Sequence, residues 1–308
     1  MFLRPIQFFP TNTNIDFVAI RWWAFSVTLL LVLITVVSLF IKGLNFGIDF
    51  KGGILIEAKA SEIVDTGALR SSLSTLELGE VELQQFGSPY DVLIRIQRQT
   101  GDEAAQMKAV QSVRDKLGTS YEYRRVEVVG PTVGTELLHA GILATLLAML
   151  AIGAYVAVRF EWQFGLAAFI ATFHDVFVTV GLFSVLQLDF NLTAVAALLT
   201  LAGYSINDTV VVFDRIRETL RRQKATDLRT VINASVNQTL SRTLMTGGTT
   251  LLALLPLVIM GGQTLINFSA ALFWGIFVGT YSSIYVAAAL LLYMPPLRRI
   301  EAVKKPAT

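Results

Sequence analysis

The stretch that decides the fold is Gly203-Tyr204-Ser205-Ile206-Asn207-Asp208-Thr209-Val210-Val211-Val212-Phe213-Asp214. It closes an apolar run that starts near Phe190, and a run of about 20 such residues crosses a bilayer as a helix. Asn207 and Asp208 lie inside this run. A carboxylate at that depth costs about 2.5–3.5 kcal/mol on insertion scales, so it indicates a polar interior, a partner or a bound proton. Asp208 is therefore the first functional candidate.

The composition is that of an integral membrane protein. Of 308 residues, 54% are hydrophobic and 16% are charged, whereas soluble domains carry about 25% charged residues. The sequence has no cysteine, which excludes disulfides and thiolate metal sites. Two histidines, His139 and His174, are too few for a metal site built from histidine, so we expect no metal and no cofactor.

Six apolar segments predict a polytopic α-helical membrane protein with six transmembrane helices. The first follows a lead of residues 1–21 and is interpreted as a retained anchor, because it is long for a signal peptide and no small-residue cleavage site follows it. The later five helices occupy residues 137–294, with a loop at about 214–242 and a tail at 295–308. The predicted spans are 22–41, 138–158, 163–186, 190–213, 243–260 and 268–293.

The distribution of charge predicts the orientation in the membrane. Six spans place both termini on one side, and the two short loops on the other side hold Asp189 but no Lys or Arg. The positive-inside rule therefore makes the termini cytoplasmic, and topology explains the basic loop without a nucleic-acid partner. The basic residues on the cytoplasmic side are Arg4, Arg21, Arg159, Arg215, Arg217, Arg221, Arg222, Lys224, Arg229, Arg298, Arg299, Lys304 and Lys305.

One large polar insertion, residues 42–136, is predicted to form a domain outside the cytoplasm. Its pattern reads as a strand at 46–59, a helix at 61–78, strands at 81–86 and 92–96 joined by a turn at 87–89, a helix at 102–117 and a strand at 121–129. That β-α-β-β-α-β order predicts a ferredoxin-like α+β domain. It contains no phosphate loop, metal cluster or catalytic triad, so we interpret it as a binding or mechanical module.

Glycines mark both connections between this domain and the membrane helices. Gly52 and Gly53 lie where the chain enters the domain, and Gly130 and Gly134 lie where it leaves. The entry pair is equally consistent with a tight strand start and with a hinge. We expect Thr132 or Thr135 to cap the following helix.

Polar side chains within the spans add further candidates. Asp175 lies near mid-depth beside His174, and it serves either a structural hydrogen bond or ion passage. In the fifth span Arg242 and Thr246 share a helix face with Thr249 and Thr250. A stripe of this kind facing Asp208 would form a wet pocket, with Arg242 as fixed charge and Asp208 as the proton carrier.

The last span carries small residues at a spacing of four, which is typical of close helix packing in membranes. This seam belongs either inside the chain or against a helix of another chain. Its residues are Ala271, Gly275, Gly279, Ser283 and Ala287.

Several motifs together resemble the SecD/SecF family of protein-export membrane proteins, and its SecF branch in particular. The resemblance extends from about residue 22 to residue 293, and the fourth-span motif is the most specific part of it. The motifs are Phe46-Gly47-Ile48-Asp49-Phe50-Lys51-Gly52-Gly53, Phe160-Glu161-Trp162, His174-Asp175, Gly203-Tyr204-Ser205-Ile206-Asn207-Asp208, and Arg242-Thr243 followed by Gly248-Thr249-Thr250.

The resemblance implies membership of the resistance-nodulation-division superfamily, whose members combine two six-helix halves into an ion-driven machine. This chain holds one half, so a separate SecD partner is implied. The resemblance also implies contacts with the SecYEG translocon, with accessory membrane subunits and with an unfolded preprotein. The implied location is the bacterial inner membrane. The implied energy source is a proton or sodium gradient. The ion path of the family maps onto Asp208 and Arg242, and we add Asn207, Asp175 and Thr246. Gly247 departs slightly from the family pattern.

Three alternatives compete with an export subunit that is not an enzyme. A small-molecule exporter subunit of the same superfamily is disfavoured by the single small domain. An intramembrane aspartyl protease would pair Asp175 with Asp208. A purely structural scaffold predicts that Asp208→Asn is tolerated. Either H⁺ or Na⁺ suits an aspartate among hydroxyls and amides.

Overall fold

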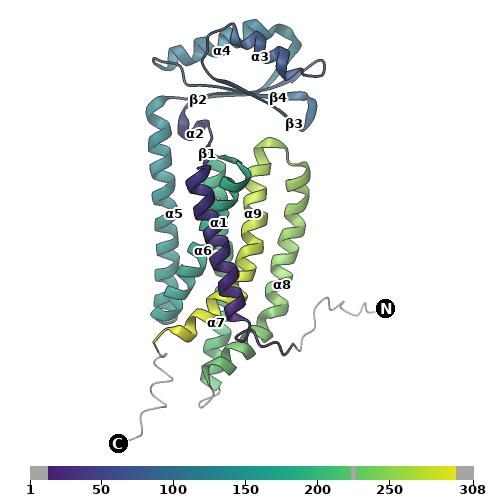
Figure 1. Cartoon of the computed structure of the whole chain (residues 1–308). Coiled ribbons are helices and arrows are strands. Elements are labelled where there is room, and N and C mark those ends of the chain that lie inside the picture. The colour runs from purple at the N-terminus through teal and green to yellow at the C-terminus, as the bar shows by residue number, and fades with distance from the viewer. Residues whose placement is uncertain (1–12, 223–226, 296–308) are drawn as a thin grey trace, which may run out of the picture.

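The computed structural model describes residues 13–222 and 227–295 of the chain, so most of the predicted tail and the first part of the lead lie outside it. Figure 1 shows a bundle of long helices with a small sheet domain at one end. Six helices of the described part are long and apolar enough to cross a membrane, which confirms a polytopic helical membrane protein. The long helices are α1 (Arg21–Ile41), α5 (Pro131–Arg159), α6 (Trp162–Leu186), α7 (Leu192–Arg222), α8 (Leu228–Met260) and α9 (Gly262–Ser282).

The sixth span changes its winding near its end. After α9 the chain continues through a π-helical turn, Ser283–Ala287, then α10 (Ala288–Leu290) and a 3₁₀ turn, Leu291–Tyr293. Single π-helical turns inside α-helices often mark functional sites. This one begins at the two buried serines, Ser282 and Ser283.

Helices α7 and α8 are longer than the sequence predicted. The expected loop at 214–242 is mostly helix, because α7 runs to Arg222 and α8 starts at Leu228. Arg, Glu and Leu are good helix formers, so the polar composition of this segment does not end a helix. Glu218 also bridges Arg215 at 2.5 Å and Arg222 at 2.7 Å one turn to either side.

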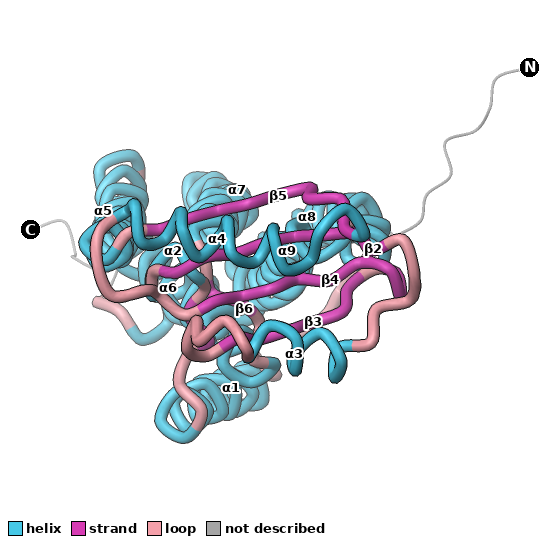
Figure 2. Tube along the Cα trace, turned by 90° about the horizontal axis from the view of Figure 1, so that it is seen from above, coloured by secondary structure: helices cyan, strands magenta, loops and turns pink. Residues whose placement is uncertain are grey.

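The sheet domain has the predicted order of elements. Its strands and helices are β2 (Gly53–Ala60), α3 (Thr66–Ser74), β3 (Val81–Phe86), β4 (Ser88–Ile96), α4 (Glu103–Leu117) and β5 (Tyr121–Val129). The strands form one antiparallel sheet in the order β3-β4-β2-β5, with Ile56 opposite both Ile94 and Val126. Alternate residues of β2 and β4 are buried under α3 and α4, which cover the same face of the sheet (Figure 2).

The predicted long strand at 46–59 is wrong in its first half. The structure has a two-residue strand, β1 (Asn45–Phe46), then a four-residue helix, α2 (Ile48–Lys51), and only then β2. Gly52 ends the helix with φ +74°, and Gly53 follows with φ +127°. L-residues rarely adopt these angles, so the glycine pair permits the abrupt change from helix to strand.

The turns of the sheet domain differ only slightly from those that the sequence predicts. The β3–β4 connection is tighter than predicted, because Phe86 already pairs with Ser88 across Gly87. Asp65 caps α3, with its carboxylate accepting from Gly67 N at 2.8 Å and Ala68 N at 3.1 Å. Such caps satisfy backbone N–H groups that have no partner inside the helix.

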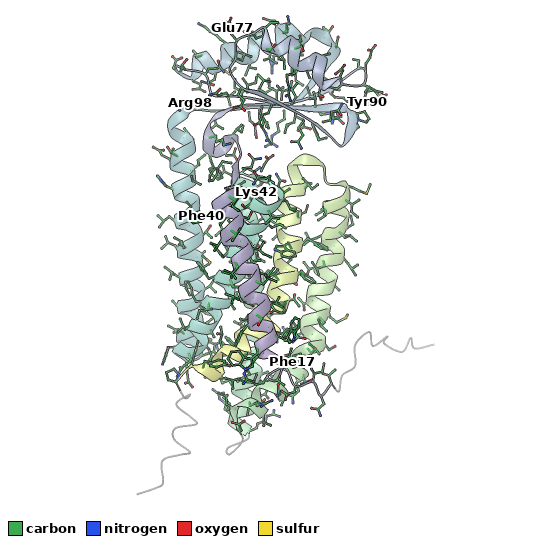
Figure 3. The ribbon with its side chains drawn as sticks, in the orientation of Figure 1. Phe17, Phe40, Lys42, Glu77, Tyr90 and Arg98 are labelled. Atoms are coloured by element: carbon green, nitrogen blue, oxygen red, sulfur yellow. The ribbon has the colours of Figure 1, made fainter. Side chains whose placement is uncertain are left out.

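The uncovered face of the sheet lies toward the helix bundle (Figure 1). Strand β1 pairs in parallel with β6 (Asp189–Phe190), which lies between α6 and α7, so the entry to the domain is hydrogen-bonded to the bundle. The Arg95 guanidinium of β4 forms an ion pair with the Asp189 carboxylate below it. Figure 3 places Phe40 and Lys42 at this end of α1, with Arg98 and Tyr90 in the domain above them.

The described part of the N-terminal lead is docked on α8. Asn237 exchanges two hydrogen bonds with the backbone of Ile15, at 2.9 and 2.8 Å. The Asp16 carboxylate accepts from Ala19 N, Asn233 and Arg229, and these contacts lower its pKa below the ordinary value. Residues 13–20 therefore fix the end of α8 that lies away from the sheet domain.

Helices α1 and α6 cross without space for a side chain at Gly181. A Cβ atom there would lie 2.1 Å from the Thr35 hydroxyl oxygen. We expect Gly181→Leu to lower the midpoint of thermal unfolding in detergent by several degrees, because overpacking a tight contact costs about 1–3 kcal/mol. The matched control is Gly203→Leu, since nothing lies within 4 Å of a Cβ atom at Gly203. Equal midpoints for the two variants would contradict the close crossing.

Candidate ion-coupling site

Helix α7 places Asp208 inside the bundle. The residue is only 3% exposed and shares the buried side of the helix with Ser205 and Thr209. Its Oδ2 atom is buried without a hydrogen-bond partner among the described residues. A buried acid without a partner is costly, and this state is relieved when the acid binds a proton or a cation.

Arg242 lies on α8 and is exposed, unlike Asp208. Its charge acts electrostatically on the Asp208 carboxylate, but no direct ion pair joins them in this arrangement. The pair predicted from the sequence is thus brought near, with the acid inside the bundle and the base on its surface.

The predicted hydroxyl stripe of α8 does not point its donors at Asp208. Thr246 Oγ1 donates to the Arg242 carbonyl at 2.9 Å, and Thr249 Oγ1 donates to the Met245 carbonyl at 2.8 Å. Thr250 Oγ1 donates to the Thr246 carbonyl at 2.8 Å and accepts from the Tyr204 hydroxyl of α7 at 3.1 Å. These hydroxyls therefore donate to their own helix and none of them bonds the buried Asp208 Oδ2, so the stripe facing the acid stays a prediction.

A polar cavity does open beside Arg242, at the end of the bundle away from the sheet domain. The acids lining it are Asp214 and Glu218, whereas Asp208 is not part of the lining. The expected wet pocket thus exists on the Arg242 side only. The cavity therefore does not open onto the Asp208 carboxylate in this structure.

Asp175 is held in a separate hydrogen-bond network at the centre of the bundle. It is fully buried, and its Oδ2 accepts from Ser205 Oγ at 2.5 Å and from Ser282 Oγ at 2.7 Å. His174 Nδ1 lies 3.0 Å from the other carboxylate oxygen. The network joins α6, α7 and α9, which supports the structural alternative for Asp175.

The network includes Ser282, which the sequence did not single out, and hydroxyl contacts among residues that it named for other reasons. Ser205 is three residues before Asp208, and Thr209 Oγ1 lies 2.9 Å from Ser283 Oγ in the π-helical turn. The signal was a serine pair, Ser282 and Ser283, inside an otherwise apolar span. Because Ser205 and Asp208 share one helix, a shift of α7 changes both sites together.

We expect Asp175→Asn to lower thermal stability but to leave the gradient response of the remaining protein intact. Both serines donate to the same oxygen, so the amide can keep them only by turning its NH2 group toward His174 Nδ1. Neutral hydrogen bonds then replace charge-assisted ones, which are roughly twice as strong. The measurement is thermal unfolding in detergent together with transport in vesicles. Loss of the gradient response at full stability would instead assign Asp175 to the ion path.

The small-residue seam of the last span faces the inside of the chain. A Cβ atom at Gly275 would lie 2.4 Å from Leu201 of α7, and one at Gly279 would lie 3.4 Å from both Asp175 and Ser205. The alternative that this seam contacts another chain is therefore wrong. Close approach of α9 to α7 is what builds the Asp175 network.

A different face of α7 is left uncovered. Gly203 and Asn207 are exposed, and Thr200 lies one turn earlier on the same side. Asn207 is thus exposed while its neighbour Asp208 is buried, and its place in the ion path stays a prediction. Exposed polar side chains at membrane depth require a partner or water, since lipid offers none.

The glycines at the domain connections are mostly required by close packing. A Cβ atom at Gly53 would lie 2.7 Å from the Ile96 carbonyl oxygen, and one at Gly134 would lie 2.5 Å from that of Phe50. Gly130 has open space around it and is the N-cap residue of α5, so Thr132 and Thr135 both lie within the helix and not at its N-cap position. The structure supports the tight-entry alternative for Gly52 and Gly53.

A profile of the family described as "Protein export membrane protein SecD/SecF, C-terminal" matches residues 109–296, and one described as "SecD/SecF GG Motif" matches residues 37–62. The chain belongs to the SecD/SecF family. Relatives named "Protein translocase subunit SecF" include that of Rickettsia prowazekii, which is 44% identical over 94% of each chain. The one of Magnetococcus marinus is 47% identical over 94% of this chain and 95% of the relative.

Solved structures of SecDF are similar to this SecD/SecF chain. The crystal structure of SecDF from Thermus thermophilus, described as a translocon-associated membrane protein, matches with a TM-score of 0.82 and 36% identity. The match covers 94% of this chain but 39% of that one. SecDF in a super-membrane-facing form matches with a TM-score of 0.68 over 40% of its chain. The chain thus corresponds to one part of the longer SecDF protein.

Proposed function

We propose that this chain is the SecF-type subunit of the protein-export machinery. In this role it works with a SecD partner and uses a proton or sodium gradient to promote movement of unfolded preproteins. The observation that carries the proposal is its similarity, over 94% of both chains, to proteins named as translocase subunits. The buried, unpartnered carboxylate of Asp208 supports the gradient dependence.

The SecD partner is proposed to cover the exposed face of α7 and α8. Both helices expose residues at membrane depth, namely Gly203 and Asn207 on α7 and Arg242 and Thr249 on α8. Covering them with a second six-helix half would remove the cost of polar groups in lipid. SecDF of Thermus thermophilus is longer than this chain, which is consistent with a missing half. SecYEG, accessory subunits and preprotein complete the proposed assembly.

The domain is proposed to be ferredoxin-like and to face the periplasm. Its all-antiparallel sheet, order β3-β4-β2-β5 with two helices on one face, supports the split βαβ class. The excess of Arg and Lys at the opposite end of the bundle supports cytoplasmic termini in the inner membrane. The basic hairpin of α7 and α8 would then project into the cytoplasm.

We expect a cysteine introduced by Ser88→Cys to react with a membrane-impermeant maleimide in intact spheroplasts. Ser88 begins β4 at the hairpin of the sheet domain, and the chain has no natural cysteine, so labelling reports this site alone. The matched control is a cysteine at Arg222, at the far end of α7, which should react only after lysis. Labelling of the cysteine at Arg222 but not of the one at Ser88 in intact spheroplasts would show that the orientation is opposite to the proposed one.

A small-molecule exporter of the same superfamily is the competing function. The test is preprotein translocation into vesicles that contain SecYEG and SecD, with and without this chain, under a proton gradient and then a sodium gradient. We expect the gradient-dependent part of translocation to require the chain. An equal gradient effect without the chain would refute the export function.

A further inference from the structure

Residues 47–53 form the joint between the sheet domain and α7, the helix that carries Asp208. Gly47 N donates to the Phe190 carbonyl at 2.8 Å, which holds the first end, and Gly53 pairs with Val129 of β5 at the other end. Gly52 N donates to the Ile48 carbonyl at 2.8 Å within the joint. Helix α2 lies between these two bonds and leads into β2 through Gly53. The joint therefore moves as a unit with the start of the sheet.

Asp49 of this joint binds the first residue of α7. Its Oδ2 accepts a hydrogen bond from Leu192 N at 2.8 Å. Asn191 caps the same helix end by accepting from Ala194 N at 3.0 Å. The first N–H groups of a helix have no partner inside it and carry a positive partial charge, so the Asp49 carboxylate stabilises this helix end by hydrogen bonding and by charge.

Helix α7 extends without a break from that cap to the ion-coupling acid. It is continuous over Leu192–Arg222, and the distance along it from Leu192 to Asp208 is about 24 Å at the usual rise per residue. A translation or tilt of α7 at Asp208 therefore appears at its capped end. Asp49 is the side chain of the joint that receives this motion directly.

Packing keeps the joint from moving independently of the helices. Gly134 at the start of α5 contacts the Phe50 carbonyl so closely that a Cβ atom would lie 2.5 Å from it. On the other side Gly47 contacts Asn191, at 3.1 Å between its would-be Cβ atom and Asn191 Cβ. The joint is held between α5 and α7, and a change in the position of α7 displaces it.

We propose that Asp49 is a positioning residue that transmits the state of α7 to the sheet domain. The proposal rests on the proposed function, since it assumes that Asp208 changes state during transport. Asp49 would tie the domain to the helix that carries this acid, while the Arg95–Asp189 ion pair holds the sheet above the same helix end. Loss of the hydrogen bond from Leu192 N to Asp49 would uncouple the sheet domain from α7 and leave Asp208 unchanged.

The test compares Asp49→Ala and Asp49→Asn with Asp65→Ala in vesicles containing the whole assembly. The amide oxygen of asparagine can accept the same bond from Leu192 N, whereas alanine has no acceptor. We expect Asp49→Ala to reduce the gradient-dependent part of translocation about fivefold, the effect of losing one helix cap, and Asp49→Asn to keep most of it. Asp65→Ala removes the cap of α3 in the same domain and should leave the gradient-dependent part unchanged.

Translocation without a gradient and the amount of folded chain are measured for each variant. Equal losses in Asp49→Ala and Asp65→Ala, or an undiminished gradient response in Asp49→Ala, would overturn the proposal. Asp208→Asn in the same vesicles distinguishes failure of the Asp49 role from failure of the proposed function. If it abolishes the gradient response while Asp49→Ala keeps it, only the role of Asp49 fails; if Asp208→Asn keeps the response, the proposed function fails and the role of Asp49 fails with it.

Discussion

Asp208→Asn is expected to abolish the gradient-dependent part of preprotein translocation, while the chain still folds and binds its partner. Asparagine has nearly the shape of aspartate but cannot titrate or carry a charge. The site is buried and leaves Asp208 Oδ2 without a partner, so removal of the charge does not break a hydrogen bond among the described residues. Folding should therefore be unchanged or slightly improved, since an unpaired buried charge is costly.

The measurement is translocation into vesicles with and without a proton-motive force, repeated with a sodium gradient. The matched control is Asp214→Asn, because Asp214 is an exposed acid on the same helix. Arg242→Ala should resemble Asp208→Asn, since it removes the charge that acts on the acid. A full gradient response in Asp208→Asn would show that the acid is structural.

The sequence predicted the spans and the element order of the domain because both depend on local pattern. The strands at 81–86 and 121–129 were placed at the residues where the structure has them, since alternation is decided within a few residues. Burial of Asp208 followed from its place in a span. Helix α2 was missed because its four residues lie in a run that also suits a strand, and the φ angle of Gly52 cannot be read from composition.

The sequence could not predict which neighbouring helix each helix face contacts. The spacing of Gly275 and Gly279 predicts a packing seam, but the same spacing suits an internal and an external partner. Only the fold shows that Gly279 lies against Asp175 and Ser205. In the same way Asn207 and Asp208 are neighbours in the chain, yet a helix turns about 100° per residue and sends them to different surroundings. Adjacent positions in the sequence therefore do not show whether two side chains share one environment.

Tethering the sheet domain to the bundle is expected to stop gradient-dependent translocation almost completely. Glu57 on β2 and Thr193 on α7 line the same cleft between sheet and bundle, on opposite sides of it. Cysteines at these positions would be the only two in the chain, so a short bismaleimide can join them selectively. The tether leaves Asp208 and Arg242 untouched and fixes only the distance between the domain and α7.

The control pair is Glu57→Cys with Glu127→Cys, which lie on neighbouring strands of the same sheet face and tether the domain only to itself. If work is done by movement of the domain, the first pair loses gradient-dependent translocation after cross-linking and the second keeps it. Both double variants should be active before the reagent is added, because the Arg95–Asp189 ion pair and the Asp49 cap are intact in each. Full activity of the Glu57–Thr193 tether would mean that the domain stays docked during transport, and that α7 acts on the partner through its exposed face instead.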